Sequence, residues 1–117
     1  MRSLSFFSML LGIGLIQACT MSAVPSKYQG HWAGDQESCS VSSSADSMTL
    51  ASDRVLFTES SGQLMSSSQS DGNLHLIFNM QGEGETWRSE EVYSLNSGGQ
   101  VLVRYTKNST FKYFRCN

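Results

Sequence analysis

The chain has 117 residues, with 8 Lys and Arg against 10 Asp and Glu, a formal net charge of −2 and three cysteines. This length provides for one domain with a single hydrophobic core. Nucleic acid is not an expected partner, because binding to phosphates depends on concentrated Lys and Arg, and the sequence contains no basic cluster.

An apolar segment follows Arg2 at the N-terminus. Residues 4–16 read LSFFSMLLGIGLI, and a positive residue followed by such a run is typical of a secretory signal peptide. A membrane-spanning helix needs about 20 apolar residues, and this run is shorter. We therefore expect residues 1–18 to be removed, which takes away one basic residue and leaves a net charge of about −3.

The run ends in Ile16-Gln17-Ala18-Cys19, which resembles the bacterial lipobox, whose cysteine is acylated and becomes the first mature residue. Aspartate after the cysteine would resemble an inner-membrane retention signal, but this chain has Thr20 there. The resemblance therefore implies lipid anchoring at the outer membrane, facing the periplasm, with about 0.8 kcal/mol for each buried methylene. The alternative is ordinary cleavage nearby, for instance after Ala23, which would discard Cys19 and release the protein into the periplasm.

Acylation of Cys19 would leave two cysteines, Cys39 and Cys116. In an oxidising compartment this pair predicts a disulfide. Closing a loop of about 77 residues would stabilise the fold by about 4 kcal/mol. A zinc site is the alternative, but the sequence lacks the paired Cys and His spacing of such sites. We expect no metal and no cofactor.

The remaining chain divides into a tether and one domain. Residues 19–28 are polar and contain the only proline, so we predict a lipid-anchored tether there and a single domain over residues 29–117. Apolar side chains alternate with others through residues 74–80, as in a strand with one buried face. Similar runs cover residues 54–59, 86–95, 101–105 and 111–115, with turn sequences between them. We therefore predict an all-β fold, a small antiparallel meander that closes into a barrel or a curved sandwich, its interior largely filled by side chains.

Two segments of the domain are rich in serine, residues 41–47 and residues 65–70. Serine hydrogen-bonds its own backbone and resists packing. We predict a solvated loop or an edge strand for both segments.

A glycine-rich segment, GEGETW, covers residues 82–87. No helix follows it, so it is not a dinucleotide-binding loop. We predict a tight hairpin or a bulge in which Gly82 and Gly84 take conformations closed to other residues. Its two glutamates are candidates to pair with Arg88 and Arg115.

Three local patterns occur in order: G-x-W-A followed by a cysteine (residues 30–39), G-E-G-x-T-W (residues 82–87) and Y-x-R-C (residues 113–116). Together they resemble a group of small exported bacterial proteins of uncharacterised function. The resemblance covers residues 29–116. It implies one β domain with a terminal disulfide, and it implies no activity.

The two tryptophans are candidates for structural or binding roles. Gly30 suits a first strand that passes close to a neighbour while Trp32 plugs one end of the barrel. We expect Trp87 to plug the other end or to pack on the disulfide. The alternative for both tryptophans is stacking on a sugar or gripping a ligand.

No catalytic constellation stands out. The sequence has no G-x-S-x-G nucleophile elbow and only two histidines, His31 and His75, so we expect no enzyme and no catalytic residues. Our leading hypothesis is a non-enzymatic, monomeric cell-envelope lipoprotein that presents its domain to a macromolecular partner. Inhibition of a protease or a lysozyme is one form of this function, because small β-barrel periplasmic protease inhibitors share a first-strand G-x-W followed by a cysteine. Their disulfide closes a shorter loop, however.

Two alternatives to this hypothesis remain. One is a lipocalin-like carrier of a small apolar ligand, which requires an open interior. The other is a structural accessory of an outer-membrane assembly.

Overall fold

The computed structural model describes residues 20–21, 23–40 and 45–117, so the expected signal peptide and Cys19 lie outside the described residues. The strands are β1 (Thr20–Met21), β2 (Gly30–Ala33), β3 (Ser47–Leu50), β4 (Arg54–Leu56), β5 (Ser61–Ser70), β6 (Asn73–Gly82), β7 (Glu85–Leu95), β8 (Val101–Tyr105) and β9 (Thr110–Arg115). Two short helices accompany them, the 3-10 helix η1 (Ser26–Tyr28) and α1 (Gln36–Cys39). No helix in these described ranges is long and apolar enough to cross a membrane.

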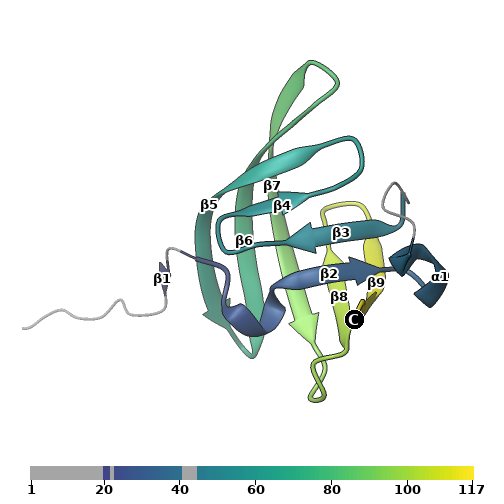
Figure 1. Ribbon diagram of the computed structural model, residues 1–117. Coiled ribbons are helices and arrows are strands. Elements are labelled where there is room, and N and C mark those ends of the chain that lie inside the picture. The colour runs from purple at the N-terminus through teal and green to yellow at the C-terminus, as the bar shows by residue number, and fades with distance from the viewer. Residues whose placement is uncertain (1–19, 22, 41–44) are drawn as a thin grey trace, which may run out of the picture.

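The strands form one antiparallel sheet in the order β1-β5-β4-β3-β2-β9-β8-β7-β6, and β5 also pairs with β6. This additional pairing closes strands β2 to β9 into an eight-stranded barrel (Figure 1). Each strand of the ring pairs with the next one along the chain, and β9 returns to β2. The predicted all-β meander is confirmed, in its barrel form. Strand β1 lies outside this ring and pairs with β5.

Strict alternation along the strands fills the barrel. In β6, Leu74, Leu76 and Phe78 are fully buried, while His75 and Asn79 on the other face are partly or largely exposed. This is the period of two expected from the sequence, in which successive side chains point to opposite faces. The buried core consists of Val24, Tyr28, Trp32, Met48, Leu50, Val55, Leu74, Leu76, Phe78, Met80, Tyr93, Leu102 and Tyr113.

The packed body begins earlier than the predicted boundary at residue 29. Val24 and Tyr28 are 1% and 2% exposed, and both belong to the core. The Val24 N–H donates to the Ser52 carbonyl oxygen at 2.9 Å. Because burial of these side chains holds the segment against the barrel, residues 24–28 are part of the domain and not of a tether. The predicted tether is therefore too long at its C-terminal end.

The serine-rich residues 65–70 form the second half of β5, so the strand alternative holds there. The expectation of solvation is wrong at Ser67, which is fully buried. A register shift between Leu64 and Ser66 explains this position, because the extra residue moves the next inward-facing position from 66 to 67. In the other serine-rich segment, residues 41–44 lie outside the described residues.

The predicted disulfide between Cys39 and Cys116 is present, with a Cα–Cα distance of 5.5 Å. It joins the end of α1 to the residue that follows β9. Next to it the Cys116 N–H donates to the His31 carbonyl oxygen at 2.9 Å. Helix α1 begins after Asp35, whose carboxylate accepts from the Ser38 N–H at 2.8 Å, as in a standard N-cap.

Replacing both Cys39 and Cys116 by serine, in a Cys19→Ser background, should lower the free energy of unfolding by about 4 kcal/mol, because the unfolded chain regains the entropy of an open loop. Denaturant titration measures this difference. Treating the Cys19→Ser protein with a reductant should produce the same loss. An unchanged midpoint after complete reduction would show that the bond contributes little.

Candidate functional site at the open end of the barrel

The two ends of the barrel differ, and one of them carries η1 and the β7–β8 turn (Figure 1). Packed side chains close this end. Trp32 is fully buried, and its Nε1–H donates to the Tyr28 carbonyl oxygen at 3.0 Å. The Arg115 guanidinium lies 4.2 Å from the centre of the Trp32 ring. The N–H groups of Arg115 also donate to the carbonyl oxygens of Lys27, Gln29 and Gly99 at 2.7, 2.8 and 2.9 Å. The cluster fastens η1 and the β7–β8 turn over this end.

Gly30 permits this closure. Its φ is +142°, and a Cβ atom there would lie 2.7 Å from Nη1 of Arg115. Any other residue would meet both an unfavourable backbone conformation and the arginine side chain. The close approach predicted for Gly30 is therefore present, with Arg115 as the neighbour.

The ion pairs expected between the arginines and the glycine-rich segment are replaced by other contacts. Arg115 binds carbonyl groups at the closed end. Arg88 lies 3.4 Å from the Glu90 carboxylate on the exposed surface of β7. Alternation in β7 explains the second contact, because residues 88 and 90 face the same side of the strand.

The opposite end of the barrel contains a cavity of about 320 Å³, which we call the mouth cavity. Its apolar lining comes from Ala45, Phe57, Met80, Trp87 and Phe111. Its polar lining comes from Asp46, Ser60, Ser89, Glu91, Arg104 and Tyr113. These residues come from β6 to β9 and from the loops that precede β3 and β5.

A buried ion pair forms the floor of the mouth cavity. Nε and Nη2 of Arg104 donate to Oε1 and Oε2 of Glu91, both at 2.9 Å. The Tyr93 hydroxyl donates to Oε1 at 2.6 Å, and the Ser89 hydroxyl donates to Oε2 at 2.8 Å. Each carboxylate oxygen thus accepts two hydrogen bonds, which is the condition under which a buried charge is tolerated.

Two aromatic rings enclose the arginine of this pair. The Arg104 guanidinium lies 4.7 Å from the centre of the Phe57 ring and 4.9 Å from that of Phe111. Its Nη1 donates to the Tyr113 hydroxyl at 3.3 Å. Cation–π attraction and the hydrogen bonds therefore fix the side chain in one orientation.

Burial opposes the ionisation of Glu91, but the hydrogen bonds and the charge of Arg104 outweigh it and hold the pKa of this carboxyl below its ordinary value. Burial raises the pKa of Tyr93 well above 10 and also raises that of Tyr113. At neutral pH the pair is ionised and both phenols are neutral. None of these groups is placed to exchange a proton near neutrality, so the floor serves for structure or for binding more readily than for acid–base chemistry.

Trp87 lies at the mouth cavity and is 43% exposed. The prediction that it plugs the second end or packs on the disulfide is therefore wrong. It faces Met80 in the β6–β7 ladder, close to the tip of the hairpin. Because this hairpin extends beyond the rest of the barrel (Figure 1), the indole contributes to a rim and not to a plug.

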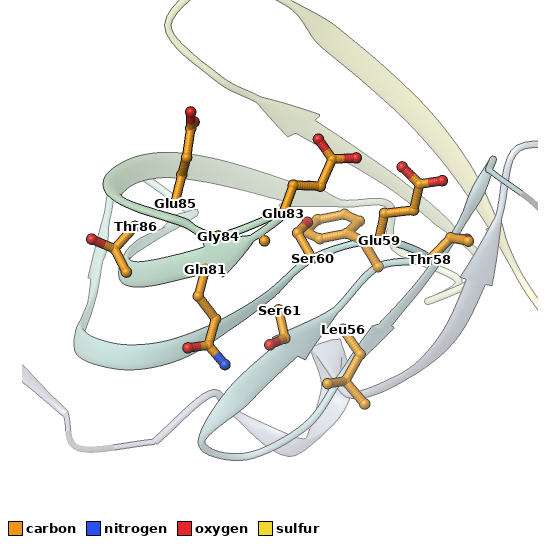
Figure 2. A pocket seen from close by; sticks show the side chains of 12 residues that line it. Leu56, Thr58, Glu59, Ser60, Ser61, Gln81, Glu83, Gly84, Glu85 and Thr86 are labelled. Carbon is orange, nitrogen blue, oxygen red and sulfur yellow. The ribbon is translucent and has the colours of Figure 1, made fainter.

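A second hollow, of about 570 Å³, lies between the loop at residues 57–60 and the tip of the β6–β7 hairpin. Figure 2 shows the carboxylates of Glu59 and Glu83 on the same side of it. The predicted tight hairpin is present, with positive φ angles at Glu83 and Gly84. For Gly82 the predicted conformation is wrong, because its φ is not positive. Lack of space favours glycine there instead, since a Cβ atom would lie 2.8 Å from the Glu59 carbonyl oxygen.

Comparisons with models of protein families, with curated proteins and with solved structures find no match for this chain. Within the described ranges, no group of three or more His, Cys, Asp or Glu side chains is arranged to hold a metal ion.

Sequence reasoning missed Glu91 and Arg104. Their positions in the strand alternation could have revealed them. Residue 91 lies on the same face of its strand as Tyr93, and residue 104 lies on the same face as Leu102. A charged side chain on an apolar face indicates a buried partner.

Replacing Glu91 by glutamine should lower the free energy of unfolding by about 3–5 kcal/mol, because Arg104 would remain buried without a counter-charge. Denaturant titration measures the loss. The matched control is Glu90→Gln, which removes an exposed carboxylate one residue away and should change stability by less than about 0.5 kcal/mol. Equal effects of the two variants would contradict a buried pair.

The ion pair of Glu91 and Arg104 should also make the free energy of unfolding depend on pH. Because the pKa of folded Glu91 is lowered, its stabilising contribution is complete above the ordinary value of 4.5 and is lost as the pH falls through the folded value. The difference in stability between the wild type and Glu91→Gln should therefore be constant at neutral pH and decrease below about 4.5. A difference that stays constant into strong acid would show that the carboxylate is not ionised in the pair.

Proposed function

We propose that the chain is a non-enzymatic cell-envelope lipoprotein, anchored through acylated Cys19 at the outer membrane, whose open barrel end binds a protein partner. One observation carries the proposal: a filled and cross-linked barrel leaves large aromatic side chains uncovered around the mouth cavity. Trp87 and Phe111 are 43% and 41% exposed there. Aromatic side chains in this setting are frequent anchors of protein interfaces.

The filled interior favours a macromolecular partner over the carrier alternative. Leu76, Phe78 and Tyr93 are fully buried inside the barrel. The mouth cavity is near the lower limit of small-ligand pockets, about 300 Å³. An extended apolar cargo would therefore have to displace the core.

The β6–β7 hairpin supports the inhibitor form of this function. Its tip extends beyond the barrel (Figure 1), as a segment that enters the cleft of an enzyme would have to do. Glu59, Glu83 and Glu85 line the hollow beside the tip, and carboxylates there favour a basic partner surface. Assays of proteases and lysozymes with the purified protein test this form, and the absence of inhibition would leave only non-inhibitory binding.

Acylation of Cys19 would determine the N-terminus and the mass of the mature protein. Protein purified from cell membranes should begin at residue 19 and carry acyl chains on it, and Cys19→Ser should abolish both features and release the protein from the membrane. Intact-mass spectrometry together with fractionation measures this. A mature N-terminus beyond residue 19 without fatty acid would contradict anchoring.

If the open end of the barrel binds a protein partner, cross-linking to that partner should depend on the position of the cross-linking residue. A photo-reactive amino acid in place of Trp87 should yield one stoichiometric protein adduct in intact cells, because this position lies at the proposed interface. The matched control is Met65, which is 59% exposed on β5 and should yield none. The same adduct from both positions, or none from either, would contradict binding at the open end.

A further inference from the structure

We propose that the mouth cavity accepts one neutral aromatic ring that carries a hydrogen-bond acceptor, presented as a tyrosine-like side chain by the partner. The identity of the source rests on the proposed function. The chemistry of the occupant rests on the cavity itself.

The lining of the cavity suits an aromatic ring. Its volume is about 320 Å³, and the large apolar side chains in its lining are Phe57, Met80, Trp87 and Phe111. Two of these side chains, Trp87 and Phe111, are exposed, so an entering group can reach them from solvent. Aromatic rings gain from stacking or edge contacts with such walls beyond the area that they bury.

The floor disfavours a charged occupant of either sign. Glu91 and Arg104 neutralise each other, and both oxygens of Glu91 already accept two hydrogen bonds. Asp46, which also lines the cavity, already has an interaction of its own. An entering ammonium would meet Arg104, and an entering carboxylate would meet Glu91. Either would lose its hydration next to a charge of its own sign.

The floor does offer hydrogen-bond donors. A guanidinium has five N–H groups, and the bonds from Arg104 to Glu91 and Tyr113 use three of them. The Tyr113 oxygen accepts one of these bonds, so its own proton points elsewhere. A phenol oxygen entering with its ring can accept from these groups, whereas a purely aliphatic occupant leaves them without a partner.

The test is an NMR titration of the intact mature protein with p-cresol. Benzylammonium and phenylacetate serve as charged probes of similar size. The indole N–H of Trp87 reports on the mouth cavity, and that of Trp32 at the closed end is an internal reference. We expect p-cresol to shift the Trp87 signal saturably and to leave Trp32 unchanged. The charged probes should bind about tenfold more weakly or not at all.

Variants separate the contributions of wall and floor. Trp87→Ala should weaken p-cresol binding about tenfold, followed through the Arg104 side-chain signal, while Met65→Ala should not change it. Tyr113→Phe should weaken p-cresol binding about threefold to tenfold and leave toluene binding unchanged. The absence of saturable binding, equal affinity for the charged probes or an equal shift at Trp32 would overturn the proposal.

A competition experiment identifies the source of the ring. With the photo-reactive residue at position 83, saturating p-cresol should reduce the partner cross-link if the partner supplies the ring. An undiminished cross-link would overturn the assignment of the ring to the partner, and native mass spectrometry would then reveal any free aromatic molecule. Specific p-cresol binding without any cross-link would support the cavity and contradict the proposed function. A cross-link without p-cresol binding would support the proposed function and contradict the proposal for the cavity.

Discussion

The barrel depends on the pairing of its first strand with its last. β2 and β9 share only two residue pairs, Trp32 with Arg115 and Ala33 with Phe114, whereas β6 and β7 share nine. This ladder is as short as the one between β3 and β4, and it is the one ladder of the ring that joins distant parts of the chain. Other interactions compensate: the disulfide lies directly beside it, and Arg115 binds backbone carbonyls of the N-terminal segment and of the β7–β8 turn. Most residues of the two sequence patterns at the ends of the domain, residues 30–39 and 113–116, therefore help to close the barrel.

Closure has different consequences at the two ends of the ring. Where η1 covers the barrel, Val24, Tyr28 and Trp32 are buried and fill that end. At the other end three inward positions in a row on β7, residues 87, 89 and 91, are Trp, Ser and Glu. A carboxylate at the last of these positions has to be paired, and Arg104 on the adjacent strand β8 supplies the charge. The pair forms the floor of the mouth cavity, and the carboxylate in it has both oxygens hydrogen-bonded.

The sequence contained the alternation of β6, the pairing of Cys39 with Cys116 and the meander, because each depends on local spacing or on the small number of cysteines. It did not contain what depends on distances in space. A bulge after Leu64 reverses the parity of β5, and no local residue signals it. The exposure of Trp87 depends on how far one hairpin outreaches its neighbours. The partnership of Glu91 with Arg104 spans thirteen residues and requires the register of two strands. The acylation of Cys19 stays a prediction from its motif.

The up-and-down order of the strands also has a consequence for the pathway of folding. All ladders of the ring but one connect strands that are neighbours in sequence, so they can form as hairpins at low entropic cost. The β2–β9 ladder must wait until segments about 80 residues apart have met, which makes it the slow and non-local step. The disulfide beside this ladder joins residues 77 positions apart, so it holds covalently the part of the ring that local contacts do not secure.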